Sequence, residues 1–290
     1  MSDFTLFIDS TCDLSEELYQ TIGAKIIPYH FVLEGKEYPD DRKTMSTAEF
    51  YNKLRGGAVA TTVQINTYDF VEEFTPELEA GRDVLYLCFA SSCSGTYQAA
   101  LAAEDELREK WPERKIYIID TKAQSAGEGL LAYRTAEQKR AGMGIDELKS
   151  WVLENVDRHC HLFTIDDLNT ARRSGRLSRA SAVMGTLIGI KPVMYTDMDG
   201  VLSVGAKVRG RRQAINMLVD KFCEKAVNPE DQLILINQAD VHDEAVYLAD
   251  EIKKRVTVGK IEILPLGPVI GAHTGPGCLT LFFVGADKNW

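Results

Sequence analysis

The sequence predicts an α/β protein with two domains, and two observations predict this class. Short apolar strands alternate with helical patterns through the first half of the chain, and the second half adds six strand patterns around two amphipathic helices. At 290 residues the chain is long enough to bury two hydrophobic cores. We therefore expect an α/β/α layered domain with a parallel sheet at residues 1–157 and an α+β domain with a mixed sheet at residues 158–290.

The first half supplies the elements of the layered domain. Capping-box spacing at 13–16 and at 46–49 predicts two helix starts, and glycines at 23 and 56 predict where these helices end. The strands that we expect here are residues 4–8, 24–33, 84–89 and 115–119. Further helices are expected at 68–79, at 97–110 and in an Ala/Leu-rich stretch that ends near Gly142.

The second half of the sequence has more strand patterns for each helical pattern than the first half has. The two helices carry apolar residues on one face, around 214–222 and 245–252. A turn that contains Asp199 and Gly200 joins two of the strands as a hairpin. The expected strands are residues 160–165, 193–196, 201–208, 232–237, 260–266 and 279–284.

Composition and charge exclude several classes of function. The formal net charge of −10 argues against a nucleic-acid partner, although residues 172–179 form a basic patch that either meets phosphate groups or is a solvated loop. The first residues do not resemble a secretory signal, and the apolar stretches are too short to span a bilayer. Six scattered cysteines fit reduced thiols, so we expect a cytoplasmic protein without disulfides.

Two hydroxyl-rich loops, at 61–66 and 91–96, stand where strands should end and helices begin. Helix N-termini have unpaired N–H groups and attract anions, so two such loops predict a pocket for one small carboxylate or phosphate group. The competing interpretation is that Asn66 and Ser94 are ordinary helix N-caps.

A third loop, at 267–277, is rich in glycine and proline and has His273 at its centre. Its backbone can approach a ligand closely, and an imidazole there can donate to an anion. The alternative is a histidine that holds its own turn.

Other chemistry is weakly supported. His159 and His161 share one face of a strand, but no further ligands have metal-site spacing, so we expect no metal and no cofactor. The phosphate-binding loop of nucleotide hydrolases is absent, and the glycines at 127 and 129 follow their strand too late for a dinucleotide site. The acidic pairs at 40–41 and 166–167 are interpreted as local caps or ion pairs. A serine hydrolase using Ser94 and His273 and a regulator that binds a phosphate ligand remain as alternatives.

An ordered set of motifs resembles the DegV family from residue 4 to about residue 285. The motifs are Asp9-Ser10-Thr11-Cys12-Asp13-Leu14, Thr61-Thr62-x-Gln64, Ser91-x-x-Ser94-Gly95-Thr96-Tyr97-Gln98, Asp120-Thr121-Lys122-Ala123-Gln124-Ser125-x-Gly127, Asp166-Asp167-Leu168, Gly175-Arg176-Leu177-Ser178, Ile190-Lys191-Pro192 and Gly271-Ala272-His273-Thr274-Gly275-Pro276-Gly277.

The resemblance implies a bacterial protein that holds one long-chain fatty acid between a Rossmann-like N-terminal domain and a C-terminal α/β domain. It also implies a partner, a kinase subunit resembling dihydroxyacetone kinase, which converts the presented acid to an acyl phosphate, and at most transient membrane contact. By this resemblance Thr62 and Ser94 hydrogen-bond the carboxylate and His273 contacts the head group. Arg209 acts in phosphoryl transfer or in docking the kinase.

The first loop departs from the usual pattern of the family. Val63 and Ile65 stand where serine and proline are common, and Val63 removes a hydrogen-bond donor. An apolar segment at 180–194 is a candidate wall for the acyl chain or an ordinary core helix.

Overall fold

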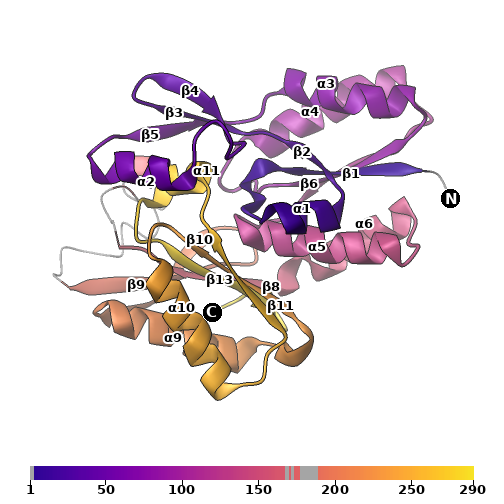
Figure 1. The fold of residues 1–290 in the computed structure, drawn as a ribbon. Helices are drawn as coiled ribbons and strands as arrows, with labels where there is room; N and C mark the ends of the chain where they lie inside the picture. Colours follow the sequence, from indigo (N-terminus) through magenta and orange to yellow (C-terminus); the bar gives the residue numbers. More distant parts are fainter. Residues whose placement is uncertain (1–2, 167–169, 171–172, 177–188) are drawn as a thin grey trace.

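The computed structural model describes residues 3–166, 170, 173–176 and 189–290, and Figure 1 shows its layers. Much of the basic patch at 172–179 and most of the apolar segment at 180–194 therefore lie outside the described residues, as do Asp167 and Leu168. Within the described part of the chain, no helix is both long enough and apolar enough to cross a membrane.

The first sheet confirms the expected parallel α/β/α layer. Its strand order is β2-β1-β6-β7, and all three pairings are parallel. Alternate side chains of these strands enter two different cores, one beneath helices α3 and α4 and one above α1, α5 and α6 (Figure 1). The elements are β1 Phe4–Asp9, α1 Glu16–Ile22, β2 Lys25–Ile27, α3 Thr67–Glu79, β6 Asp83–Cys88, α4 Thr96–Lys110, β7 Ile116–Asp120, α5 Ala126–Arg140 and α6 Ile145–Asn155.

The second sheet confirms the mixed sheet that the sequence predicts. Its strand order is β10-β9-β8-β13-β11-β12, in which β11 and β12 are parallel and the other neighbours are antiparallel. Helices α9 and α10 cover one face, and α5 packs against the other. The elements are β8 His159–Thr164, β9 Ile190–Thr196, β10 Leu202–Arg209, α9 Arg211–Lys225, β11 Leu233–Gln238, α10 His242–Arg255, β12 Lys260–Pro265 and β13 Leu279–Val284.

Helix α5 lies between the two sheets and is buried along most of its first three turns. At Gly127 a Cβ atom would stand 2.3 Å from the ring of His161 on β8, so glycine allows the helix and the second sheet to approach this closely. At Gly129 a Cβ atom would stand 2.6 Å from Leu14, so both glycines are packing residues. The domain boundary at 157 stays a prediction.

A third, small sheet corrects the expected organisation of residues 24–66. It consists of β3 His30–Leu33, β4 Lys36–Pro39 and β5 Ala60–Val63 in the order β4-β3-β5. The extended run at 24–33 is therefore split between two sheets. Thr62 lies within β5, opposite Phe31, because the backbone of β5 pairs with β3 before the chain enters α3. The prediction that Thr62 lies in a loop at a helix N-terminus is wrong.

Helix starts are partly as predicted. Ser46 caps α2, Thr47–Arg55, by accepting the N–H of Glu49 at 3.2 Å. In α1, however, Ser15 and not Asp13 is the N-cap, and Asp13 is fully buried with a φ of +50°. Its carboxylate is occupied elsewhere, so it does not cap α1.

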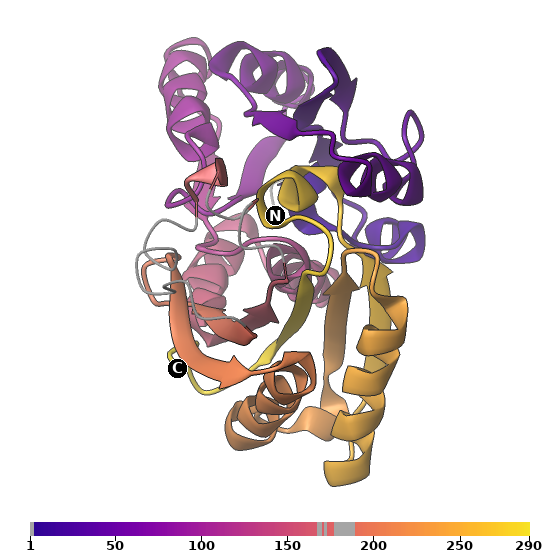
Figure 2. The same ribbon diagram turned by 90° about the vertical axis from the view of Figure 1, so that its left-hand side faces the viewer.

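The glycine- and proline-rich loop at 267–277 contains a short helix that the sequence did not predict. This helix, α11, spans Pro268–Thr274 and begins with a proline, whose missing N–H costs nothing at a first helical position. It packs against α2, β3 and β5, far from it in sequence (Figure 2). His273 is therefore carried by a helix embedded among first-half elements.

Candidate ligand-binding site

A cavity of about 160 Å³ opens where β5, the loop after β6, the start of β10 and α11 meet. Its apolar lining comes from Phe89, Leu202, Val269 and Ile270, and its polar lining comes from Tyr29, Thr62, Gln64, Ser94, Gln124, Arg176, His273 and Thr274. Three of the residues predicted for the site, Thr62, Ser94 and His273, thus line one cavity, which we call the head-group pocket.

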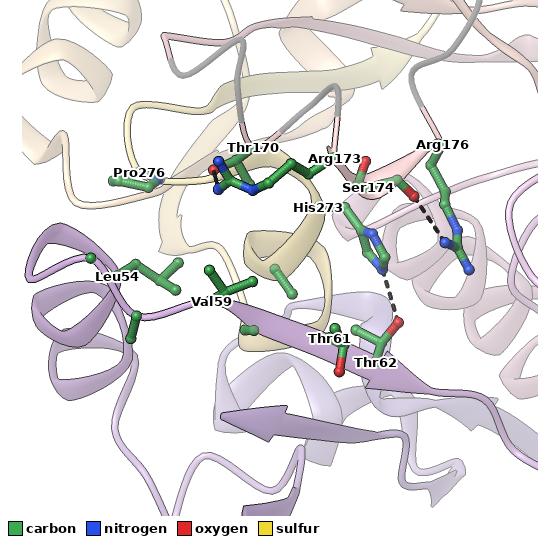
Figure 3. Close-up of a pocket in the computed structure, with 14 residues that line it drawn as sticks. Leu54, Val59, Thr61, Thr62, Thr170, Arg173, Ser174, Arg176, His273 and Pro276 are labelled. Carbon is green, nitrogen blue, oxygen red and sulfur yellow. Dashed lines mark hydrogen bonds between the residues drawn. The ribbon is translucent and has the colours of Figure 1, made fainter. Parts of the chain in front are cut away.

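Thr62 and His273 face each other across this pocket. Thr62 Oγ1 lies 2.9 Å from Nε2 of His273, and Figure 3 shows the two side chains pointing toward one another from β5 and α11. Both also line an adjoining cavity of about 390 Å³, together with Arg176 and the aliphatic side chains of Leu54 and Val59. Thr62, His273 and Arg176 therefore line both cavities.

Burial sets the protonation state of His273. Burial, with a smaller contribution from the nearby Arg176 guanidinium, lowers the pKa of the imidazole to about 4. The ring is therefore neutral near pH 7. Its Nδ1 is shut off from solvent and has no hydrogen-bond partner among the described residues. A neutral imidazole with one unused nitrogen can take up a hydrogen bond from or to a ligand.

Ser94 reaches the pocket from the loop that precedes α4. Its Oγ accepts a hydrogen bond from Tyr29 Oη at 3.3 Å and lies 2.9 Å from Oγ1 of Thr96. The N-cap of α4 is Gly95, so the interpretation of Ser94 as an ordinary N-cap is wrong. Asn66, by contrast, is the N-cap of α3, in a complete capping box with Asp69.

The hairpin between β9 and β10 holds this loop in place. Ser92 Oγ and Gln124 Nε2 both donate to the carbonyl of Gly200, at 2.6 and 2.9 Å. Gly200 has a φ of +78° and lies against Lys122, which suits glycine. The tip of a second-sheet hairpin is thereby fixed beside Ser94.

Arg209 does not line the pocket. It is exposed at the end of β10, the edge strand of the second sheet, whereas Leu202 at the start of that strand contributes to the pocket wall. Seven residues of extended chain span about 23 Å at 3.3 Å each. Arg211, two residues further on, lies in α9 and is bound to Glu244 at 2.7 Å, so it does not share a strand face with Arg209.

The hydrolase and metal alternatives gain no geometric support. Ser94 is bonded to Tyr29 and Thr96, and His273 to Thr62; no hydrogen bond between Ser94 and His273 is found in the described structure. Burial lowers the pKa of His159 to about 3 and that of His161 well below its usual value. Over the ranges that the structure describes, no three potential metal ligands come together.

Five polar residues of the pocket had no role predicted from the sequence: Tyr29, Gln64, Gln124, Arg176 and Thr274. All of them except Tyr29 belong to the quoted motifs, and Tyr29 gave no local signal. Val63 is 38% exposed and does not line the pocket, because its side chain alternates with that of Thr62 along β5. Having valine at position 63, where the family commonly has serine, therefore leaves the Thr62 side of the pocket intact.

Solved structures of similar fold are lipid-binding proteins. A fatty-acid-binding DegV family protein from Thermus thermophilus has a TM-score of 0.89 and 28% identity, covering 98% of this chain and 100% of its own. A DegV lipid-binding protein from Thermotoga maritima has a TM-score of 0.84 and 27% identity, covering 99% and 100%. A fatty-acid-binding DegV family protein from Streptococcus agalactiae has a TM-score of 0.87 and 25% identity, also covering 99% and 100%.

The sequence comparisons agree with the structural ones. A DegV domain-containing protein of Clostridium perfringens is 40% identical over 290 residues, which is the full length of both chains. The family model described as "Uncharacterised protein, DegV family COG1307" matches residues 3–286. The chain belongs to the DegV family.

Proposed function

We propose that this protein binds a long-chain fatty acid between its two predicted domains, residues 1–157 and 158–290. Thr62, Ser94 and His273 hydrogen-bond the carboxylate, and the apolar side of the pocket receives the acyl chain. The observation that carries the proposal is the convergence of these three donors on a cavity whose other wall is Phe89, Leu202, Val269 and Ile270. Ligand pockets typically combine an apolar lining with a few placed polar groups.

The energetics favour an anion with a long apolar tail. Each buried CH₂ contributes about 0.8 kcal/mol, so a chain of roughly 16 carbons contributes on the order of 12 kcal/mol before the costs of binding. Neutral hydroxyl and imidazole donors can hold a carboxylate, and Arg176 adds a permanent positive charge at the same cavity. The similar solved proteins that bind fatty acids support the same ligand class.

We also propose that the bound acid is presented to a separate kinase subunit, in the cytoplasm and with at most transient membrane contact. Arg209 suits a docking role, because an exposed guanidinium can pair with an acidic partner surface. Its position about 23 Å along β10 from the pocket wall argues for docking over direct contact with the carboxylate.

Native mass spectrometry of protein purified from bacteria tests ligand binding. We expect a bound mass equal to that of a long-chain fatty acid, which disappears after delipidation and returns when oleate is added. Ester turnover measured on the same samples should be absent. Protein that carries no lipid and takes up no oleate, or turnover that Ser94→Ala abolishes, would contradict the proposal.

A further inference from the structure

The carboxylate of Asp13 connects the first half of the chain to the helix that carries His273. Asp13 Oδ1 accepts the backbone N–H of Gly267 at 2.9 Å, directly before α11 begins. Asp13 Oδ2 accepts the hydroxyl of Ser125 at 2.7 Å, directly before α5 begins. One buried side chain thus fixes the starting points of two helices.

The backbone around Asp13 is fixed as well. Asn237 on β11 donates from Nδ2 to the carbonyl of Asp13 at 2.9 Å, and both residues are fully buried. Arg42 lies 3.5 Å from the Asp13 carboxylate and donates to the carbonyl of Leu14 at 2.5 Å. These contacts hold Asp13 at its positive φ, a conformation that costs energy for a residue other than glycine.

The contact with Gly267 leaves no room for another residue. A Cβ atom at Gly267 would stand 2.1 Å from Asp13 Oδ1. One turn further along α11, Gly271 lies against Phe50 and Tyr51, and Tyr51 Oη donates to the carbonyl of Leu266 at 3.0 Å. The helix is therefore fastened at its start and along its side, and His273 at its end meets Thr62.

We propose that Asp13 is a positioning residue for the head-group pocket. Its carboxylate holds the start of α11, so that His273 stays within hydrogen-bond distance of Thr62. The inference rests on the proposed function for its ligand readout, while its structural readouts need no ligand. Because Asp13 and Gly267 are 254 positions apart, this bond forms only when the two halves of the chain are docked. The pocket is complete in that docked arrangement.

Three variants test whether Asp13 positions α11 and His273 or only stabilises the folded protein. Asp13→Ala removes the acceptor, Asp13→Asn keeps an oxygen for the Gly267 N–H, and Asp40→Asn is the matched control. Asp40 is buried in the same group of acids, but it is bonded to Ser10 at 2.9 Å. Protein labelled with ¹⁵N-histidine reports on His273, whose signals are assigned with His273→Gln.

In Asp13→Ala we expect shifted or broadened His273 signals and oleate dissociation at least about tenfold faster, since a charged hydrogen bond is lost. In Asp13→Asn the His273 signals and the dissociation rate of oleate should be close to those of the unaltered protein. In Asp40→Asn both should be unchanged. Unchanged His273 signals in folded Asp13→Ala, or equal changes in Asp40→Asn, would overturn the inference.

A measurement on the unaltered protein covers the case in which Asp13→Ala does not fold. The Gly267 amide should be strongly protected from hydrogen exchange, and exchange at the rate of an open loop would overturn the inference. Failure of the proposed function would appear differently, as absent oleate binding with a protected Gly267 amide.

Discussion

The ends of two neighbouring strands of the parallel sheet differ sharply. β1 and β6 pair directly, and each leads into a loop rich in hydroxyl groups. The loop after β6 leaves Ser94 facing a cavity. The loop after β1 turns inward, and its polar groups bond to one another and to buried carboxylates. The two strand ends therefore differ in whether their hydroxyl groups face a cavity or are bonded to buried carboxyls.

The loop after β1 surrounds a group of buried acids: Asp9, Asp13, Asp40 and Glu128. Burial raises the pKa of Asp13 to about 6 and that of Asp40 to about 7. The carboxyl of Asp9 adds to the rise at Asp13 and that of Asp13 adds to the rise at Asp40, whereas Arg42 lowers both pKa values. The pKa of Asp9 and that of Glu128 are raised by burial as well. This region, as far as the structure describes it, is crowded with buried carboxyls and offers no free donors to an anionic ligand, which supports the proposal that the carboxylate binds at the end of β6.

The largest expected effect concerns Asp40. Its pKa rises from 3.8 to about 7 on folding, so the native state binds the proton more tightly than the unfolded state between these values. The free energy of unfolding should therefore fall as pH rises from about 4 to 7, by up to about 4 kcal/mol at 1.36 kcal/mol per pKa unit. Asp40→Asn stays neutral and should lose the contribution of Asp40 to this slope in urea unfolding at several pH values, while Asp9, Asp13 and Glu128 keep theirs.

The control is Asp105→Asn, which removes an exposed carboxylate on α4. In this variant the free energy of unfolding should change with pH as steeply as in the unaltered protein. A slope in Asp40→Asn as steep as in the unaltered protein would show that the buried acids do not distinguish the end of β1 from that of β6.

A smaller effect is expected at the end of β6. Ser94→Ala and Thr62→Val each remove one hydrogen bond to the carboxylate, which costs roughly 1.5–3 kcal/mol and weakens fatty-acid retention by about ten- to a hundredfold. Thr257→Val is the matched control, because Thr257 is exposed in the loop before β12 and lines neither cavity. Retention is measured as the dissociation rate of oleate.

Arg209→Ala should retain oleate like the unaltered protein and lose acyl-phosphate formation with the cognate kinase. If Arg209→Ala released oleate as fast as Ser94→Ala, the separation between head-group binding and docking would be wrong.

The features predicted correctly are those carried by local patterns. The strands and most helices follow from periodicity. The fold brings Thr62, Ser94 and His273 to one cavity, while their role at a carboxylate stays a prediction. Asp13 was predicted to cap α1 because its spacing to Glu16 fits a capping box. Its true partner, Gly267, is 254 residues away, and no local pattern contains that information.

Other misses have the same origin. Thr62 lies in a strand because β5 pairs with β3, and this pairing also sets the length of β5. The residues next to Thr62 do not contain that information. Asp40 was interpreted as a local cap or ion pair, and this is wrong: it is buried and accepts a hydrogen bond from Ser10. Asp41 does act locally, accepting the N–H groups of Lys43 and Thr44. Adjacent carboxylates can thus have opposite environments.

The carboxylate position is the central claim, and ¹³C NMR of oleate labelled at its carboxyl carbon tests it most directly. In the unaltered protein we expect one bound signal, distinct from free oleate, that titrates below the pKa of free oleate because hydrogen bonds stabilise the ionised form. Ser94→Ala and Thr62→Val should each move this signal, while Thr257→Val and Arg209→Ala should not. A bound signal that none of these variants moves would contradict the assignment of the head group to Thr62, Ser94 and His273.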